Sequence, residues 1–393
     1  MFERITQNIT SVGVDNTSET KFENQYTLPH GMAYNSYVIK GNEKVAVIDA
    51  VEFDGFEQWR THLVGVLGEV DPDFLVVQHM EPDHSATVRE FCNMFPDAKI
   101  VCSAKAAAML DQFFPGDGLS SRAMTVKEGD TLDLGGVTLE FIAAPMVHWP
   151  EVIVTYCREE KVLFSADAFG KFGAVSYRDD WANEARRYYT NIVGKYGAQV
   201  QSLLRKIAQL DIKTIAPLHG PVLKDKLEEY IDLYQKWSTY TPEVEGTLIA
   251  YASIYGNTRQ LALLIADILA GMGEKVTTFD LCNQPLSEAV AQAFRHSRMI
   301  LASVTYDGAL FPAMHDFIYH LSIKGLRGRR VGLIENGSWG PVAARFMRDM
   351  LEKMRDMEVV EPVMTITSSF NHEKDGEKLR AFIEAYLPRP SVE

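Results

Sequence analysis

The sequence predicts two α/β domains. Residues 1–246 form a first domain in which two sheets pack face to face between outer helices, and residues 247–393 form a doubly wound five-stranded parallel sheet. Three observations support this fold class. The 393 residues exceed what one hydrophobic core normally contains. A polar segment with Pro242 and Gly246 separates a helical pattern from a new apolar strand. Short strands come in runs before this segment, whereas strands and helices alternate after it.

The first part contains short apolar runs of strand length and longer stretches with helical periodicity. We expect strands at 36–39, 45–48, 74–78, 99–102, 137–142, 152–156 and 162–165. We expect helices at about 56–67, 85–95, 104–114, 183–210 and 222–236. The early clustering of strands favours a core between two sheets, with the helices outside.

The second part repeats a strand followed by a helix. The expected pairs are 248–252 with 259–271, 275–280 with 286–294, 299–303 with 312–323, 330–335 with 342–354, and 359–364 with 373–386. Such alternation is typical of a parallel sheet that is covered by helices on both faces. Sheets of this kind bind their ligands beyond the carboxyl ends of the strands.

Composition excludes several classes of protein. Hydrophobic residues make up 46% and charged residues 23%, as in globular proteins. A net charge of -14 argues against nucleic-acid binding. No apolar run is long enough to span a bilayer, and the segment MFERITQNITSVGVDN lacks the apolar core of a signal peptide, so we expect a cytoplasmic protein without a membrane partner. The four cysteines are scattered and form no CxxC pair, which disfavours a thiolate metal site.

Candidate metal ligands gather at strand ends. The segment His79-Met80-Glu81-Pro82-Asp83-His84 follows the strand 74–78, and in an extended segment residues 79, 81 and 83 point the same way. Three further candidates follow other strands: His148, Asp167 and His219. Four imidazoles and three carboxylates are too many for one tetrahedral ion and suit two ions with a bridging carboxylate. This mixture suits iron or manganese at least as well as zinc.

Each candidate ligand also has an ordinary structural interpretation. His219 alone could be a hydrogen-bonded residue at a strand end, and Asp167 alone could cap a helix. The 79–84 cluster resists such an interpretation, because burying four polar side chains on one turn is costly without a cation.

Three loops of the second part indicate a nucleotide site. The loop before the helix 259–271 offers backbone N–H groups and hydroxyls to a phosphate. Loops after the third and fourth strands lie where a switch-point cleft forms, and Tyr306 and Trp339 could stack on a planar ring. The first strand lacks a GxGxxG motif, which disfavours a dinucleotide. The candidate residues are Ser253, Ile254, Tyr255, Gly256, Asn257, Thr258, Thr305, Tyr306, Asp307, Gly308, Asn336, Gly337, Ser338, Trp339 and Gly340.

The motifs HMEPDH, PMVHWPE, SADAFG and PLHGPV, in this order and spacing, resemble the metal-binding series of the metallo-β-lactamase fold in its flavodiiron form, which has Glu at the third position of the first motif. The segment SIYGNT resembles the phosphate loop of flavodoxins. The resemblance covers nearly the whole chain. It implies a metallo-β-lactamase-like αββα sandwich followed by a flavodoxin-like domain, with two iron ions and FMN as cofactors.

The resemblance also implies roles for single residues. His79, Glu81 and His148 would bind one iron, while Asp83, His84 and His219 would bind the other, and Asp167 would bridge them. Whether His84 is a direct ligand differs between members and stays open. Asp49 resembles the second-sphere aspartate that orients a ligand imidazole. Many members carry a His shortly after the bridging Asp, where this chain has Phe172, so the preference between gas substrates stays open.

The activity implied by the resemblance is reduction of dioxygen to water or of nitric oxide to nitrous oxide, with FMN relaying electrons. The cysteine pattern contains no rubredoxin segment, so rubredoxin or a similar external carrier would supply the electrons. The resemblance implies a head-to-tail homodimer, or a pair of such dimers, that brings one subunit's flavin beside the other's irons. The basic run KGLRGRR, residues 324–330, could steer an acidic donor, or could be a solvated turn.

Two other functions fit parts of the sequence. One is a zinc-dependent hydrolase of the metallo-β-lactamase fold with a fused flavodoxin-like domain, which Glu81 and the second domain disfavour. The other is an electron-transfer or gas-sensing flavoprotein with a vestigial metal site, which the complete set of ligands disfavours.

Overall fold

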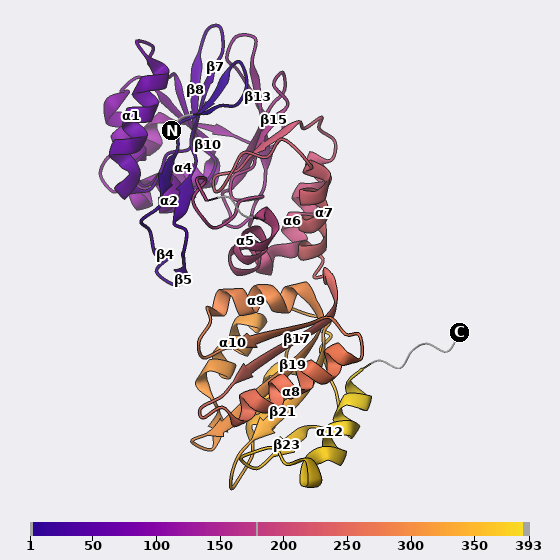
Figure 1. Cartoon of the computed structure of the whole chain (residues 1–393). Coiled ribbons are helices and arrows are strands. Elements are labelled where there is room, and N and C mark those ends of the chain that lie inside the picture. The colour runs from indigo at the N-terminus through magenta and orange to yellow at the C-terminus, as the bar shows by residue number, and fades with distance from the viewer. Residues whose placement is uncertain (1–2, 178–179, 388–393) are drawn as a thin grey trace. The chain divides into compact units, whose positions relative to one another are not determined.

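The computed structural model describes residues 3–177 and 180–387, and the chain divides into two compact units, Met1–Ser238 and Thr239–Glu393 (Figure 1). The predicted boundary after residue 246 lies within strand β17 (Val244–Ala252) of the second unit. Within the described residues, no helix is both long and apolar enough to cross a membrane.

Two mixed sheets form the centre of the first unit. The larger has the order β1-β2-β7-β8-β9-β10-β11 and the smaller has the order β12-β13-β14-β15-β16. Two short antiparallel pairs, β3 with β6 and β4 with β5, lie outside these sheets. The strands are β1 Glu3–Arg4, β2 Ile9–Ser11, β3 Val14–Asn16, β4 Lys21–Phe22, β5 Tyr26–Thr27, β6 Met32–Tyr34, β7 Tyr37–Lys40, β8 Val45–Ile48, β9 Phe74–Val77, β10 Lys99–Ser103, β11 Ala123–Val126, β12 Thr131–Asp133, β13 Thr138–Ala143, β14 Ile153–Cys157, β15 Val162–Phe164 and β16 Thr214–Ala216.

Strand β8 shows why the two sheets pack together. Its four residues are all buried, and they alternate between two hydrophobic clusters. Ala46 and Ile48 belong to the cluster that includes Phe141 and Phe164 of the other sheet. Val45 and Val47 belong to the cluster that includes residues of helix α1. Because successive side chains of a strand point to opposite faces, a fully apolar strand must be covered on both sides. The predicted αββα layering is therefore confirmed.

Helices cover the outer faces of these sheets (Figure 1). They are α1 Phe56–Leu67, α2 Pro82–Ser85, α3 Val88–Met94, α4 Ala104–Phe113, α5 Trp181–Tyr188, α6 Gly197–Ile207 and α7 Leu227–Ser238, with short helices η1 Phe53–Gly55, η2 Leu119–Arg122, η3 Tyr189–Val193 and η4 Gly194–Tyr196. The sequence predicted one helix over 183–210, which is wrong. The segment begins as α5, widens into the π-helix η3 and restarts as α6, and Gly194 and Gly197 lie at these breaks.

The second unit is a parallel sheet with the order β18-β17-β19-β21-β22, with β20 paired to β19 and β23 paired to β21. This order is the doubly wound arrangement in which the first strand lies between the second and the third. The remaining strands are β18 Val276–Asp280, β19 His296–Tyr306, β20 Ala309–Leu310, β21 Arg330–Asn336, β22 Glu358–Val359 and β23 Met364–Ile366. The predicted fifth strand, 359–364, is thus split. Pro362 lies between its two pieces and has no N–H for the ladder.

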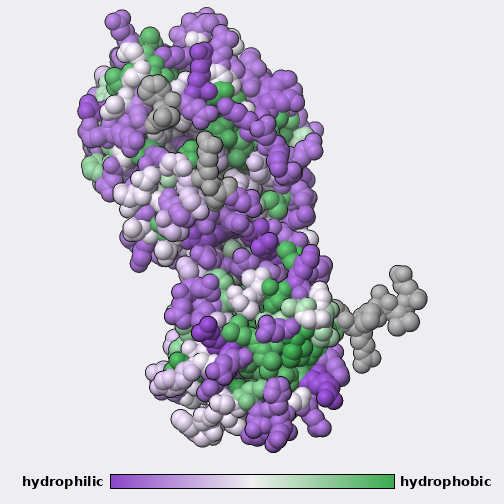
Figure 2. All heavy atoms as spheres, in the orientation of Figure 1, coloured by the Kyte–Doolittle hydropathy of each residue, from purple (hydrophilic) through white to green (hydrophobic). Residues whose placement is uncertain are grey.

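Five helices cover this sheet: α8 Asn257–Gly271, α9 Leu286–Arg295, α10 Pro312–Ile323, α11 Ala343–Leu351 and α12 His372–Tyr386. Buried residues of α8 and α12 share one cluster, and those of α9, α10 and α11 share another, so the helices divide between the two faces. Figure 2 shows hydrophobic side chains gathered around α8, where Leu263, Leu264 and Ile268 are only partly buried.

Candidate metal centre and the pocket of the second unit

The turn after strand β9 carries four of the predicted ligands. The strand is buried throughout, and residues 78–81 connect it to helix α2, which begins at Pro82, where a missing N–H costs nothing. His79 and His84 are fully buried, and Asp83 is 9% exposed. The short distance between the strand end and the helix start therefore holds these polar side chains inside the unit.

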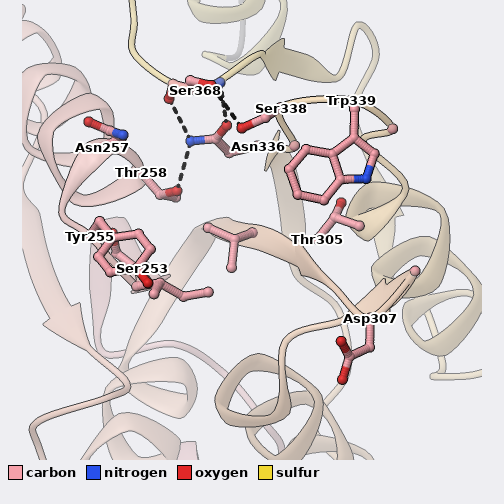
Figure 3. Close-up of a pocket in the computed structure, with 15 residues that line it drawn as sticks. Ser253, Tyr255, Asn257, Thr258, Thr305, Asp307, Asn336, Ser338, Trp339 and Ser368 are labelled. Atoms are coloured by element: carbon pink, nitrogen blue, oxygen red, sulfur yellow. Dashed lines mark hydrogen bonds between the residues drawn. The ribbon is translucent and has the colours of Figure 1, made fainter.

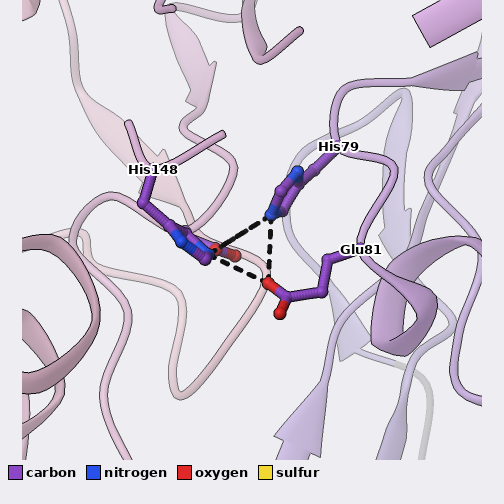
Figure 4. Close-up of side chains that lie close together, drawn as sticks. His79, Glu81 and His148 are labelled. Carbon is purple, nitrogen blue, oxygen red and sulfur yellow. Dashed lines mark hydrogen bonds and ion pairs between the residues drawn. The ribbon is translucent and has the colours of Figure 1, made fainter. Parts of the chain in front are cut away.

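The first group of candidate ligands consists of His79, Glu81, His148 and one oxygen of Asp167. Glu81 Oε2 lies 3.3 Å from His79 Nε2 and 2.9 Å from His148 Nε2. The Nε2 atoms of the two histidines are 3.4 Å apart. Asp167 Oδ2 lies 3.4 Å from His79 Nε2 and 3.0 Å from His148 Nε2. Figure 4 shows the three labelled side chains converging on one point.

The second group consists of Asp83, His84 and His219. Nε2 of His84 and Nε2 of His219 are 3.1 Å apart, and Asp83 Oδ2 lies 3.2 Å and 3.3 Å from them. The other oxygen of Asp167, Oδ1, lies 3.1 Å from His84 Nε2 and 3.7 Å from His219 Nε2. The Asp167 carboxylate therefore faces one group with each oxygen, as a bridging ligand does.

The donor set fits two cations. Ligands about 2.0–2.2 Å from one ion lie about 3.0–3.5 Å from each other, and the distances within both groups fall in or near this range. Both carboxylate oxygens of Asp83 and of Asp167 are buried without a hydrogen bond, although imidazole nitrogens lie close to them. Buried carboxylates oriented in this way are costly unless a cation completes them.

Without a cation, protons on the imidazoles balance the negative charges of the carboxylates in the site. Burial disfavours the imidazolium of His79, but Asp167, Glu151 and Glu81 outweigh burial and hold the pKa of His79 well above its usual value. Burial favours the neutral carboxyl of Asp167, but His79, His148 and His84 hold its pKa well below its usual value. In the second group, burial raises the pKa of Asp83 to about 7 and lowers that of His219. Cation binding would thus replace protons.

Groups behind the ligands fix their orientation. Glu151 Oε1 lies 2.8 Å from His79 Nδ1 and accepts the N–H of Met80 at 2.9 Å. His219 Nδ1 lies 2.8 Å from the carbonyl oxygen of Ala33. These contacts leave both Nε2 atoms free to face a cation, the arrangement typical of metal-bound imidazoles.

Asp49 differs from its predicted role. Its carboxylate accepts the backbone N–H groups of Gln78 at 2.8 Å and of His79 at 3.4 Å, and the side-chain amide of Gln78 at 3.0 Å. It therefore orients the backbone that carries His79, while Glu151 takes the imidazole. Glu151 was not predicted as a site residue, although an acid that follows His148 and Pro150 in the motif PMVHWPE was a usable signal.

Aromatic side chains enclose the second group. The ring of His219 lies 5.6 Å from that of Phe22 and 5.3 Å from that of Tyr188. The ring of Phe172 lies 5.1 Å from that of Tyr188 and 5.7 Å from that of Phe22. The Tyr188 hydroxyl is buried without a hydrogen-bond partner. It shares the buried face of α5 with Trp181 and Ala185, so helical spacing was a signal that could have found it.

A cavity of about 450 Å³ opens at the carboxyl ends of the second unit's strands. This volume suits a mononucleotide better than a substrate of a few atoms. Nearly all the predicted loop residues line it: Ser253, Ile254, Tyr255, Asn257, Thr258, Thr305, Asp307, Gly308, Asn336, Gly337, Ser338, Trp339 and Gly340, joined by Val304 and Ser368. Asp307 is the one charged residue among these, so a phosphate would rely on N–H groups and hydroxyls at the start of α8.

Hydrogen bonds join three loops around this cavity (Figure 3). The Asn336 amide donates to Thr258 Oγ1 at 3.3 Å and to the carbonyl oxygen of Ser368 at 2.8 Å, and its oxygen accepts the N–H of Ser368 at 2.9 Å. Gly256 closes the first loop with a φ of 93°, and its N–H donates to Ser253 Oγ at 3.1 Å. The cavity is therefore held open by fixed loops.

Two aromatic side chains stand at the cavity with little contact to the protein. Trp339 is 96% exposed and Tyr255 is 93% exposed, although large rings normally bury most of their surface. Tyr306, which was predicted to flank the ring, is not among the residues that line the cavity, and its contact with a flavin stays a prediction. Thr305 lines the cavity, so its strand neighbour Tyr306 points the other way, and the Tyr306 ring packs 5.5 Å from Phe311.

The basic run 324–330 is largely used within the second unit. Arg329 is 2% exposed, and its guanidinium donates to the carbonyl oxygens of Tyr240 at 2.9 Å and Phe294 at 2.8 Å. Arg327 stacks on the Tyr240 ring at 3.8 Å. Arg330 starts strand β21, whose other end carries Asn336 of the cavity. The run therefore lies at the opposite end of the sheet from the cavity, and the steering hypothesis is wrong for Arg329.

Comparisons with known proteins agree with this architecture. A family model described as ODP family beta lactamase matches residues 32–220. The coenzyme F420H(2) oxidase of Methanothermobacter marburgensis is 31% identical over 78% of each chain. The nitric oxide reductase of Moorella thermoacetica is 29% identical over 87% of each chain. The solved rubredoxin oxygen:oxidoreductase of Desulfovibrio gigas has a TM-score of 0.91 over 98% of both chains at 23% identity, which is a likeness of fold.

Proposed function

Because this chain belongs to the flavodiiron protein family, we propose that it reduces dioxygen to water, or nitric oxide to nitrous oxide, with electrons relayed through FMN. One observation carries this proposal. Seven candidate ligands form two adjoining groups that share Asp167, in the same chain as a mononucleotide-sized cavity at the ends of a parallel sheet.

Two iron ions and FMN are the cofactors of this family, and the two groups of candidate ligands fit the two iron ions. His79, Glu81 and His148 would hold one iron, Asp83, His84 and His219 would hold the other, and Asp167 would join them. Bound iron and flavin would together supply the electrons and the open coordination positions that reduction of a diatomic gas requires.

The chain's own residues prepare the site for a small apolar substrate. Phe22 and Phe172 form an apolar wall beside His219, which limits the access of water. The buried Tyr188 hydroxyl has no protein partner, so it is free to donate a hydrogen bond to a polar atom of the substrate. Phe172 cannot donate a hydrogen bond, unlike the imidazole common at this position.

The cavity of the second unit would hold FMN by two kinds of contact. Ser253, Asn257 and Thr258 lie at the start of α8, where hydroxyls and backbone N–H groups favour a phosphate. Tyr255 and Trp339 present exposed rings beside the same cavity and would cover a planar isoalloxazine.

Electron supply and assembly are further parts of the proposal. Rubredoxin or a similar small carrier would reduce the flavin, since a rubredoxin oxygen:oxidoreductase shares the fold. We infer a homodimer, and the exposed Trp339 and Tyr255 support an interface at this surface, because large exposed aromatics mark interfaces. Its head-to-tail arrangement is what the family resemblance implies. All four cysteines are free thiols, which supports a reducing compartment such as the cytoplasm.

Metal analysis and turnover test the function. The full chain, reconstituted with Fe²⁺ and FMN, should contain about two irons per chain. When it is given a reduced carrier in an anaerobic cell, it should consume dioxygen or nitric oxide that is then added in a known amount. Comparing both gases on one preparation gives the preference. Two zincs and hydrolytic activity would favour the hydrolase, and FMN reduction without gas consumption would favour a carrier or sensor.

A further inference from the structure

The cavity of the second unit has one charged side chain in its wall. Asp307 is the one charged residue among the described residues that line the cavity, and none of these is a lysine or an arginine. Figure 3 shows Asp307 on the same side as Trp339, across the cavity from Thr258 at the start of α8. The phosphate contacts proposed above lie at α8. The carboxylate therefore lies on the side of the cavity that would receive the flavin ring.

A tight hairpin turn fixes the position of this carboxylate. β19 and β20 pair antiparallel, with Tyr306 opposite Ala309. Asp307 and Gly308 are therefore the two residues of the turn, and their φ values of 48° and 70° are both positive, as a type I′ turn requires. Asp-Gly and Asn-Gly are both preferred sequences for such a turn. The backbone therefore accommodates an asparagine at position 307 as well as the aspartate.

The described wall of the cavity offers no cationic side chain to offset the charge of Asp307. An exposed aspartate carries a negative charge at neutral pH. The phosphate of FMN would bring further negative charge and would find hydroxyls, N–H groups and the positive end of the α8 dipole on the other side of the cavity. A flavin ring in this cavity would therefore lie in a negative electrostatic potential.

Reduction of a flavin adds negative charge to its ring. Two electrons from the external carrier and one proton from solvent convert the neutral oxidised ring into a reduced ring with one negative charge. A fixed carboxylate on the same side of the cavity repels the reduced ring, whereas the oxidised ring has no net charge to repel. A site that binds the reduced form less tightly than the oxidised form lowers the reduction potential by the same free energy, because binding and reduction are linked.

We propose that the Asp307 carboxylate lowers the reduction potential of the flavin in this cavity and so makes the flavin a stronger reductant of the iron pair. The residue acts through its charge alone, and it forms no bond with the flavin and exchanges no proton with it. This role rests on the proposed function, because it requires the cavity to hold FMN.

The substitution Asp307→Asn in the full, iron- and FMN-loaded protein tests this role. It removes the charge while it keeps the size of the side chain and the sequence preference of the turn. Reduced FMN should bind more tightly relative to oxidised FMN by about three- to ten-fold, a modest factor because solvent screens an exposed charge. A two-electron couple changes by about 29.6 mV per ten-fold, so the potential measured by redox titration of the flavin absorbance should rise by about 15–30 mV.

Asp356→Asn is the matched control for this substitution. Asp356 also has a positive φ, 53°, and its exposed side chain pairs with Arg355. It lies just before β22, which runs parallel to β21, so it lies at the opposite end of the sheet from the cavity. The control makes the same change of charge in a similar backbone conformation. The flavin of Asp356→Asn should keep the wild-type potential.

Salt dependence separates an effect of charge from an effect of shape. Added salt screens the carboxylate, so the potential of the wild type should rise with ionic strength towards that of Asp307→Asn. The potential of Asp307→Asn should respond less to salt. The affinity for oxidised FMN, measured by fluorescence titration, should change less than the affinity for reduced FMN.

Each outcome decides one question. A wild-type potential in Asp307→Asn would overturn the role of Asp307, as would an equal shift in Asp356→Asn or an equal change of affinity for oxidised and reduced FMN. A full chain that binds no FMN would instead overturn the proposed flavin site, and the role of Asp307 with it. None of these measurements requires turnover of a gas, so failure of gas reduction is recorded separately from failure of this inference.

Discussion

Replacing Glu151 with alanine should weaken iron binding at the first ligand group specifically. Glu151 is 1% exposed, and one of its oxygens serves both the imidazole of His79 and the N–H of Met80. Burial alone would raise the pKa of Glu151, but the hydrogen bond and charge of His79 hold it below its usual value, so the residue is ionised at neutral pH. Glu151→Ala removes a charged partner without touching any ligand.

The size of the effect follows from those two contacts. At 2.8 Å and 2.9 Å both are full hydrogen bonds, and a buried donor left without its partner costs about 1–3 kcal/mol. The metal-free protein also loses these two hydrogen bonds. The loss of iron affinity is therefore smaller than the summed cost of the two bonds. Groups that orient ligand imidazoles typically contribute ten- to hundred-fold in metal affinity, about 1.4–2.7 kcal/mol. We expect a loss in this range.

The second ligand group provides an internal reference. Its imidazole of His219 is held by the carbonyl oxygen of Ala33, which the substitution does not alter. Competition with a graded series of chelators should therefore release one iron early and the other at the wild-type chelator strength. Glu151→Gln, which retains an acceptor oxygen but no charge, should fall between the wild type and Glu151→Ala. Equal retention of both irons in Glu151→Ala would refute the reasoning.

Three further predictions concern pH, flavin binding and stability. Burial lowers the pKa of His148, but the carboxylates of its ligand group outweigh burial and raise this pKa to about 9. The protonated His148 therefore stabilises the metal-free fold fully below the usual pKa of 6.5, and this stabilisation is lost as the pH rises through 9. Iron must displace that proton, so affinity measured by calorimetry should rise from about pH 6 to about pH 9, and a flat profile would argue against this coupling. Trp339→Ala should weaken FMN binding by about 1–2 kcal/mol in fluorescence titrations, while Tyr306→Ala, outside the cavity, should not. Arg329→Ala should lower the free energy of unfolding in urea by about 3 kcal/mol, because it leaves buried carbonyl oxygens without a hydrogen-bond donor. Unchanged stability, together with a salt-dependent slowing of the protein's reduction by its electron donor, would restore the steering hypothesis.

Much of the fold was predictable because the local patterns agree with the tertiary structure. The apolar run 45–48 had to be covered on both faces, and the structure divides its residues between two clusters. Two elements were predicted wrongly, and the reasons differ. The segment 183–210 keeps helical periodicity across its two glycines, and nothing local indicates that η3 widens there. The fifth strand of the second unit was interrupted by Pro362, whose effect on pairing was visible in the sequence.

The same distinction applies to the candidate site. The ligand set was found because imidazoles and carboxylates at strand ends are conspicuous in sequence. Glu151 was missed because its position relative to His79 depends on a loop. Tyr188 was missed although it has the helical spacing of Trp181 and Ala185. Tyr306 was assigned to the cavity because it lies in the right loop, but its strand neighbour Thr305 lines the cavity and Tyr306 does not.

The distribution of protons connects these observations. His84 and His219 are 135 residues apart, yet their Nε2 atoms lie 3.1 Å from each other. Such buried groups can be held together without a cation only if protons balance their charges, and the shifts of Asp167 and His79 in opposite directions show that balance. Filling the site with cations would expel the protons from the coordinating atoms, while His79 and His219 keep their Nδ1 protons on Glu151 and Ala33. Protons consumed in turnover must then come from groups other than the coordinating atoms, because those atoms hold cations instead.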